Sequence, residues 1–203
     1  MPHSISVVLG ELLKPIEDAF GVVSATAFVL RPAADFGQEG VEELRDQTVG
    51  LLRFEKPPAS VFGRQLAFNV IPQHLIPGAG EALVRRVEGE VADLLRWNER
   101  RLAIQLAAVP VFYGHTAAVR LRLRGEASLP QVTAALAPRA PGPRPVGKGA
   151  PGTPMEAAAG PAATLSHVSE DGASGFWVWL IAGEAAAASA RAAVDLAAAL
   201  AEI

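Results

Sequence analysis

The sequence contains a serine and a histidine, the two side-chain types that nucleophilic catalysis often combines. Ser4 lies in the N-terminal stretch MPHSIS, directly ahead of an apolar run, and His115 lies in FYGHTAAV. A histidine with a pKa of about 6.5 can move protons near neutral pH, and a Ser–His pair can form an activated nucleophile. Together with Gln38, these residues could serve hydrolysis or ligand binding. The alternative is structural: Ser4 caps a helix, Gln38 is a polar residue in a first helical turn, and His115 lies at a strand turn.

Composition removes several other kinds of chemistry and of partner. The chain has 203 residues and no cysteine, which excludes disulfides, thiolate metal sites and thiol catalysis, and we expect no metal. A net charge of −3 gives no electrostatic reason to expect nucleic acid. No apolar stretch has the length of a membrane span, and the N-terminus lacks the basic region and cleavage site of a secretory signal. We therefore expect a globular, cytoplasmic protein that binds neither nucleic acid nor a membrane.

Apolar periodicity and capping residues predict five helices. They cover residues 4–20, 37–52, 80–97, 128–137 and 184–203. Ser4 is the expected cap of the first helix, and Pro15 should kink or break it. In the second helix, helical spacing predicts that Val41, Leu44, Thr48, Leu51 and Leu52 point inward, and in the third that Leu83, Val87, Val91, Leu94 and Leu95 do so.

Runs rich in β-branched and alternating apolar residues predict six strands. They cover residues 22–31, 64–72, 102–112, 116–125, 163–171 and 175–183. The third and fourth runs are joined at YGH, so we expect them to form an antiparallel pair. The fourth run alternates cleanly and places Arg120, Arg122 and Arg124 on one face, which is either an interface or a solvated surface.

Strands and helices alternate without a regular βαβ repeat, which predicts an α+β fold. We expect a single domain over residues 1–203, with a mixed, largely antiparallel sheet, helices on one face, and the other face available for pairing. Residues 138–161 are dense in proline and glycine, and we expect them to form an extended connection. No glycine-rich phosphate-binding fingerprint such as GxGxxG follows a first strand.

Five stretches of the sequence resemble, in order and spacing, the C-terminal dimerisation domain of the aspartate-semialdehyde dehydrogenase family. They are LKPIEDAFG, GQEGVEELRDQT, LAFNVIPQ, VPVFYGH and FWVWLIAGE. The resemblance covers essentially the whole chain. It implies a fold like the C-terminal domain of glyceraldehyde-3-phosphate dehydrogenase and a homodimer formed through the sheet. The family's enzymes serve amino-acid biosynthesis from aspartate and carry an N-terminal Rossmann domain for NADP, so we expect no cofactor in this chain itself.

The resemblance also assigns positions to the site residues. The family attacks its aldehyde substrate with a cysteine thiolate in a Pro-Asn-Cys turn, and Pro2-His3-Ser4 matches that turn, so Ser4 stands at the nucleophile position. Gln38 matches the glutamine that orients the acyl intermediate, and His115 matches the general base. Arg86 keeps the positive charge of the position that binds phosphate.

Three departures from the family's pattern predict that the chain is catalytically inactive. Ala108 stands seven residues before His115, where the family has the arginine that holds the substrate carboxylate. Leu83 and Val84 replace the acidic residue that binds the substrate amine. Glu184 is followed by four alanines, where the family has a basic group near the cofactor.

Residues that act as one catalytic unit fail as a unit. We therefore expect a dimerisation-domain protein that associates with itself, with an active paralogue or with another partner. The alternative is a fragment of a longer NADP-dependent oxidoreductase of the same family.

Overall fold

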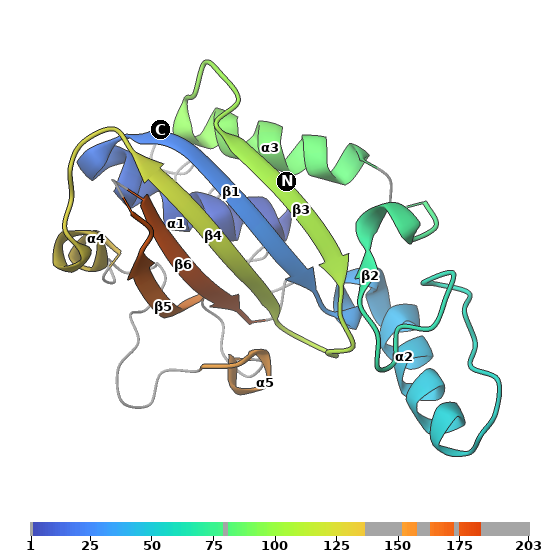
Figure 1. Cartoon of the computed structure of the whole chain (residues 1–203). Coiled ribbons are helices and arrows are strands. Elements are labelled where there is room, and N and C mark those ends of the chain that lie inside the picture. Colours follow the sequence, from blue (N-terminus) through green and yellow to red (C-terminus); the bar gives the residue numbers. More distant parts are fainter. Residues whose placement is uncertain (1, 79–80, 137–151, 158–162, 173–174, 184–203) are drawn as a thin grey trace, which may run out of the picture.

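A six-stranded mixed sheet forms the centre of the molecule, with strand order β2-β3-β1-β4-β6-β5. A computed structural model describes residues 2–78, 81–136, 152–157, 163–172 and 175–183 of the chain. The strands are β1 (Val22–Arg31), β2 (Ile71–Pro72), β3 (Leu102–Ala108), β4 (His115–Leu123), β5 (Thr164–Glu170) and β6 (Gly175–Ala182). Helices α1 (Ser4–Phe20) and α3 (Ala82–Leu95) cover one face of this sheet, and α4 (Leu129–Ala135) packs beside α1 (Figure 1). The predicted α+β fold is confirmed.

Helix α1 supplies much of the main core. Leu9, Leu12, Leu13 and Ile16 recur at helical spacing and are at most 1% exposed. The helix continues through Pro15 without a break. Its N-cap is His3 rather than the predicted Ser4, because the His3 Nδ1 atom accepts a hydrogen bond of 3.2 Å from the Ile5 N–H group. Ser4 is the first helical residue.

The predicted antiparallel pairing of β3 with β4 is wrong, since β1 lies between them. β3 runs parallel to β1, from Ala25 opposite Leu102 to Arg31 opposite Ala108, and β4 pairs with the other edge of β1 in antiparallel fashion. The intervening loop crosses the end of β1 and is bonded to it. Val109 N–H donates to Arg31 O at 3.0 Å, and Val111 O accepts from Ala33 N–H at 2.8 Å.

Helix α2 (Gly37–Leu52) follows a short 3₁₀ helix, η1 (Ala33–Phe36), and extends away from the sheet (Figure 1). Its packed face is not the predicted apolar stripe. Glu43 and Gln47 are buried together with Leu44, whereas Leu52 is 70% exposed. In α3, likewise, Val87, Val91 and Leu95 are buried as predicted, but Leu94 is 53% exposed.

The buried polar side chains of α2 organise the loop that follows it. Glu43 accepts hydrogen bonds from the backbone N–H groups of Ser60, Val61 and Phe62, and Gln47 Oε1 accepts from those of Leu66 and Ala67. The N–H groups of Leu66 and Ala67, which lie in the predicted strand, are therefore not available for a sheet ladder. As a result, the strand predicted over residues 64–72 is reduced to β2, and Gln73–Leu75 follows as a second 3₁₀ helix, η2.

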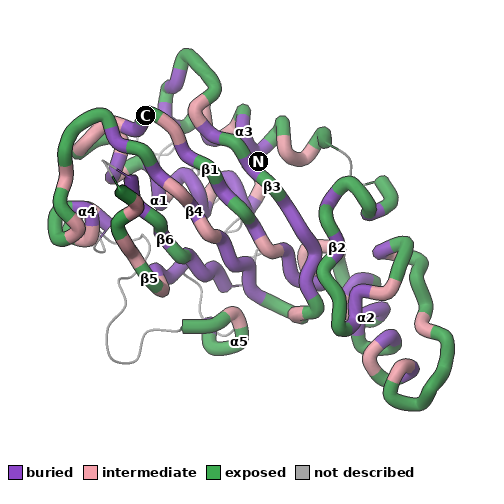
Figure 2. Tube along the Cα trace, viewed as in Figure 1, coloured by how far each residue is buried: buried purple, intermediate pink, exposed green. Residues whose placement is uncertain are grey.

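The sheet face opposite α1 and α3 is open in the described part of the chain (Figure 2). Side chains alternate between buried and exposed along its strands. One row across five strands consists of Gln105, Phe28, Ala118, Trp179 and His167, and the next consists of Ala103, Thr26, Arg120, Trp177 and Ser169.

Two predicted segments lie largely or wholly outside the described residues. The extended connection expected over 138–161 is described at residues 152–157, where Pro154–Ala157 forms a short helix, α5. The helix expected over 184–203 lies outside the described residues altogether. Of the helices that the structure describes, none combines the length and the apolar character that crossing a membrane requires.

Candidate functional site

A buried cluster of charged side chains lies where β1 ends and β4 begins. Arg31 is the last residue of β1, Asp35 lies in η1, and His115 is the first residue of β4. The Arg31 Nε–H group donates to Asp35 Oδ2, and the His115 Nε2 atom lies 3.2 Å from Asp35 Oδ1. The three side chains are only 6–7% exposed. A single carboxylate therefore contacts two nitrogen-bearing side chains from neighbouring strands.

Two further groups fix the Arg31 guanidinium. Its Nη1–H group donates to Gln73 Oε1 at 2.5 Å, and its central carbon lies 4.2 Å from the centroid of the Phe36 ring. Gln73 belongs to the FNVIPQ stretch, and the VPVF stretch supplies the loop bonded to the end of β1. The two most specific motifs of the sequence thus converge on Arg31.

The cluster keeps Asp35 ionised. Burial opposes ionisation of this carboxyl, but the contacts with His115 and Arg31 outweigh burial and lower the pKa well below its ordinary value of 3.8. The buried His115 Nε2 atom makes no aligned hydrogen bond within the described residues, so its 3.2 Å approach to Asp35 Oδ1 is an electrostatic contact. The positive charge of Arg31 is therefore neutralised by the Asp35 carboxylate inside the protein.

The turn that begins α1 reaches the same region. Burial lowers the pKa of His3, the charge of Asp35 raises it, and those of Arg31 and His115 lower it, so the His3 imidazole lies within electrostatic reach of the cluster. Glu90 of α3 holds this turn in place. Its carboxylate accepts from the His3 N–H group at 2.7 Å and from the Ser6 hydroxyl at 2.6 Å.

The structure brings some of the predicted site residues together and leaves others apart. Ser4 is buried at the start of α1, but in the described part of the chain its hydroxyl makes no hydrogen bond to His115. Gln38 is exposed and donates to Glu42 at 3.1 Å, within its own helix. Arg86 donates to Glu90 at 2.7 Å. Only His115 takes part directly in the buried cluster.

Sequence reasoning missed Arg31, Asp35 and Gln73. Arg31 and Asp35 stand in RPAADF, which indicates only the end of a strand and a turn. The spacing of four residues between two opposite charges is a signal that could have suggested their pairing. Gln73 was part of a recognised motif without an assigned role.

The three positions at which the resemblance predicts departures from the family, Ala108, Leu83 and Val84, take part in packing. Ala108 is fully buried and lies opposite Arg31 in the β1–β3 register. Leu83 and Val84 are partly buried against the main core. The three side chains therefore contribute to the hydrophobic packing of the domain.

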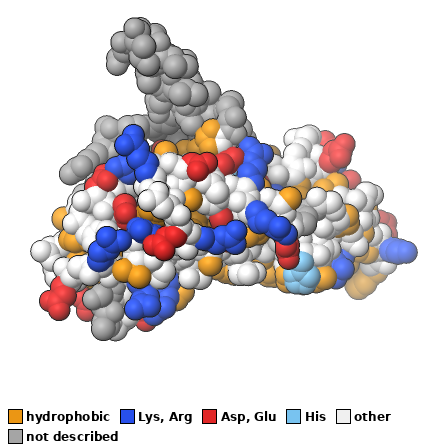
Figure 3. All heavy atoms as spheres, turned by 90° about the horizontal axis from the view of Figure 1, so that it is seen from above, with side chains coloured by type: hydrophobic (Ala, Val, Ile, Leu, Met, Phe, Trp, Pro, Cys, Tyr) orange, Lys and Arg blue, Asp and Glu red, His pale blue; other side chains and the backbone are white. Residues whose placement is uncertain are grey.

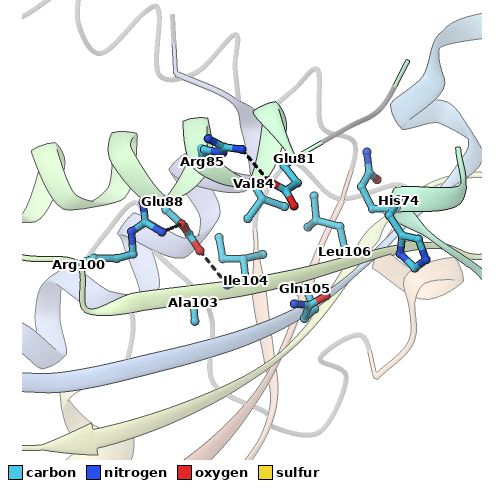
Figure 4. Close-up of a pocket in the computed structure, with 11 residues that line it drawn as sticks. His74, Glu81, Val84, Arg85, Glu88, Arg100, Ala103, Ile104, Gln105 and Leu106 are labelled. Atoms are coloured by element: carbon cyan, nitrogen blue, oxygen red, sulfur yellow. Dashed lines mark hydrogen bonds and ion pairs between the residues drawn. The ribbon is translucent and has the colours of Figure 1, made fainter. Parts of the chain in front are cut away.

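A pocket of about 620 Å³ lies between α3 and the outer edge of β3 (Figure 4). The buried Glu88 carboxylate accepts from the Ile104 N–H group at 3.3 Å and lies 3.3 Å from Arg100. Arg85 pairs with Glu81 at 2.6 Å. The charged groups of this pocket are thus paired with one another, and within the described ranges no group of three or more possible ligands could hold a metal ion.

Comparison with known proteins identifies the fold and the family. The family "Semialdehyde dehydrogenase, dimerisation domain" matches residues 13–171. The chain belongs to this family. A crystal structure of aspartate semialdehyde dehydrogenase II from Vibrio cholerae, complexed with ASA, superposes with a TM-score of 0.81 at 26% identity, covering 94% of this chain and 60% of that one. A probable aspartate-semialdehyde dehydrogenase from Pseudomonas aeruginosa gives a TM-score of 0.81 at 25% identity, covering 96% and 61%.

Curated relatives of this semialdehyde dehydrogenase dimerisation domain are considerably longer. The aspartate-semialdehyde dehydrogenase of Vibrio mimicus is 28% identical over 133 residues, which cover 64% of this chain and 42% of the relative. The USG-1 protein homolog of Pseudomonas aeruginosa is 30% identical over 137 residues, covering 66% and 40%. The chain therefore spans about two fifths of the length of the curated relatives that it matches.

The family uses NADP, but the described residues of this dimerisation domain do not fit a dinucleotide. The first strand, β1, is followed by the stretch PAADFGQEG, which lacks the spacing GxGxxG. The same stretch carries the buried, negatively charged Asp35 carboxylate, which would repel a pyrophosphate. No step involving NADP is assigned to these residues.

Proposed function

We propose that this chain acts by self-association through its open sheet face and that it does not catalyse dehydrogenation by itself. The observation that carries the proposal is the exposure of three large side chains on this face. Phe28 is 45% exposed, and Trp177 and Trp179 are each 41% exposed. They lie in adjacent rows on β1 and β6.

The chemistry of this face suits a protein partner. Tryptophan and phenylalanine supply large, rigid contact areas and are enriched at the centres of interfaces. The only ion pair described on this face joins Arg120 to Asp171, and Arg122 is exposed beside it at the rim. An apolar centre with a charged rim is the usual arrangement of an interface. By contrast, positive and negative side chains are interspersed over the surface seen in Figure 3.

The buried cluster supports the second half of the proposal. Ser4 stands at the nucleophile position, and a hydroxyl is a much weaker nucleophile than a thiolate. Ala108 cannot hold a carboxylate, and the neighbouring Arg31 is already bound to Asp35 and Gln73. Gln38 and Arg86 are engaged with Glu42 and Glu90.

The size of the protein in solution tests self-association. Sedimentation equilibrium of the purified chain over the micromolar range should give a homodimer, and mixing it with an active paralogue would reveal hetero-association. A strictly monomeric chain at these concentrations would overturn the proposal.

The alternative, a segment of a longer NADP-dependent dehydrogenase of amino-acid biosynthesis, is favoured by the length of the relatives. It is tested by assaying the product of the complete coding region with aspartate semialdehyde, NADP and phosphate. Turnover within a few orders of magnitude of an active family member would establish the alternative. Undetectable turnover, together with a dimer, would support the proposed non-catalytic role.

A further inference from the structure

The end of β1 contains the elements of a carboxylate-binding site. The two oxygens of the Asp35 carboxylate have separate partners: Oδ2 accepts from Arg31 Nε–H, and Oδ1 lies 3.2 Å from His115 Nε2. Guanidinium groups suit carboxylates because their donors match the two oxygens, and protonated imidazole also binds carboxylates. Here the carboxylate that they bind belongs to the chain itself.

The guanidinium is held as rigidly as a binding site requires. Gln73 contacts Nη1 at 2.5 Å, and the Phe36 ring packs against the guanidinium at 4.2 Å. Arg31 and its carboxylate partner are both about nine-tenths buried. Such a preorganised, desolvated cation binds an anion much more strongly than an exposed arginine does.

The position of Arg31 in the sheet relates this cluster to substrate binding in the family. Arg31 lies directly opposite Ala108 in the β1–β3 register. Ala108 is the position at which the family resemblance places the arginine that holds a substrate carboxylate. The chain therefore lacks that guanidinium on β3 but has one on the adjacent strand.

We propose that Asp35 is an internal ligand: its carboxylate fills a carboxylate-binding site formed by Arg31, His115 and Gln73, and removing it opens this site to a small monocarboxylate such as formate. The inference rests on the proposed loss of dehydrogenase chemistry, because a site filled by the chain's own acid cannot hold the acid group of a substrate. This inference and the proposed function can be disproved independently, because formate binding requires neither a dimer nor a cofactor.

The D35A substitution provides the test. It removes the carboxylate and leaves an enclosed space beside a buried cation, and formate has the size and charge of the missing group. A ligand of three heavy atoms reaches about millimolar affinity at best. Unfolding should therefore be followed over a series of formate concentrations, with chloride keeping the ionic strength constant.

We expect formate to stabilise D35A saturably. At a formate concentration 100 times its dissociation constant, the folding equilibrium constant should rise about 100-fold. Wild type should not respond, because its site is filled. D35N should not respond either, because its amide occupies the same volume.

Two variants control for general salt effects. D18A truncates an aspartate whose pairing with Lys14 is exposed, and it should not respond to formate. D35A combined with R31M should lose the response, since the cation is gone. A response of D35A no larger than that of D18A would overturn the proposal, as would a D35A protein as stable as wild type. Failure of D35A to fold in either salt would also count against it, because a bound anion should restore the lost ion pair.

Discussion

Strands β1 and β4 take part in two regions of opposite character. At the end of β1, Arg31 is matched by Asp35, Gln73 and His115 within the same chain. Only a few residues away on the same strand, Phe28 presents its ring on an open face beside the row that contains Trp177. The first region is electrically and sterically complete, whereas the second leaves apolar surface in water. The charges at the end of β1 are thus paired within the domain itself, whereas the open face is the surface to which the proposed self-association is assigned.

Substitution of Arg31 should have the largest effect and should act on stability alone. Arg31→Met keeps most of the side-chain volume but leaves the Asp35 carboxylate buried without its cation. Breaking a buried pair in this way typically costs about 3–5 kcal/mol of unfolding free energy. Urea denaturation measures this loss. The matched control is Arg45→Met, whose pairing with Asp46 is exposed, and it should change stability by less than about 1 kcal/mol. Equal stability of the two variants would contradict the expected difference between the buried and the exposed ion pair.

A second internal carboxylate sharpens the comparison. Glu43 accepts from three consecutive backbone N–H groups, and Glu43→Ala leaves them without this acceptor. Only the bond from Phe62 is fully buried, and a buried N–H group that loses its partner costs about 1–3 kcal/mol, so the effect should be smaller than that of Arg31→Met. Hydrogen exchange should accelerate at residues 60–62 and leave β1 and β4 protected. Glu42→Ala, at the adjacent exposed position, is the control. Unchanged exchange at residues 60–62 would show that Glu43 does not organise this loop.

Substitution on the open face should weaken self-association and leave the stability of the monomer nearly unchanged. If Trp179 lies at the centre of the proposed interface, Trp179→Ala should weaken self-association by about 2 kcal/mol, or roughly 30-fold in Kd. The unfolding free energy of the monomer should change little, because the side chain is 41% exposed. Sedimentation and denaturation measure the two effects separately. Leu52→Ala, on the exposed side of α2, should alter neither. A dimer as tight as wild type would place the interface elsewhere.

Lowering the pH should have the smallest and most gradual effect on the unfolding free energy. It should act first through the buried cluster at the end of β1 and the neighbouring Glu90. For Asp35, burial opposes the effect of His115 and Arg31, and for Glu90 it opposes that of the bonds from Ser6, Arg86 and His3. The bonds prevail, so both pKa values lie below the ordinary 3.8 and 4.5.

A carboxyl whose pKa is lower in the folded state contributes stability that is present above its unfolded pKa and is lost as the pH falls through the folded value. Unfolding free energy should therefore be constant near neutral pH and begin to fall below about pH 5. Denaturation at a series of pH values measures this profile, and Glu90→Gln should remove part of its slope. A flat profile down to about pH 3 would contradict the assignment of both carboxylates.

The sequence predicted the helices and strands themselves better than it predicted which strands pair and which helix face is buried. Helix α1 and strand β1 have the predicted bounds, because their apolar periodicity is set by local spacing. The pairing of β3 with β1 was missed, since a short connection at YGH favours a hairpin and only the tertiary structure places β1 between the two strands. The buried face of α2 was missed for a related reason. Glu43 and Gln47 are polar, and their burial depends on backbone groups 11–20 residues further along the chain.

The site was predicted in part. The resemblance directed attention to Ser4, Gln38, His115 and Arg86, and the roles assigned to them there stay predictions. Arg31 and Asp35 carry no family motif, and only the three-dimensional structure shows that their charges meet around His115. Local patterns do not reveal which charges will be neutralised inside a protein.

The central position of β1 has a consequence for the order of folding. β1 is synthesised well before its two neighbours, β3 and β4, which are encoded far downstream of it. At a synthesis rate of about 5–20 residues per second, both edges of β1 remain without strand partners for several seconds after it leaves the ribosome. Such non-local pairing slows folding, and unpaired edges favour aggregation. Production of the protein should therefore depend on chaperones and on temperature more strongly than its native stability would suggest.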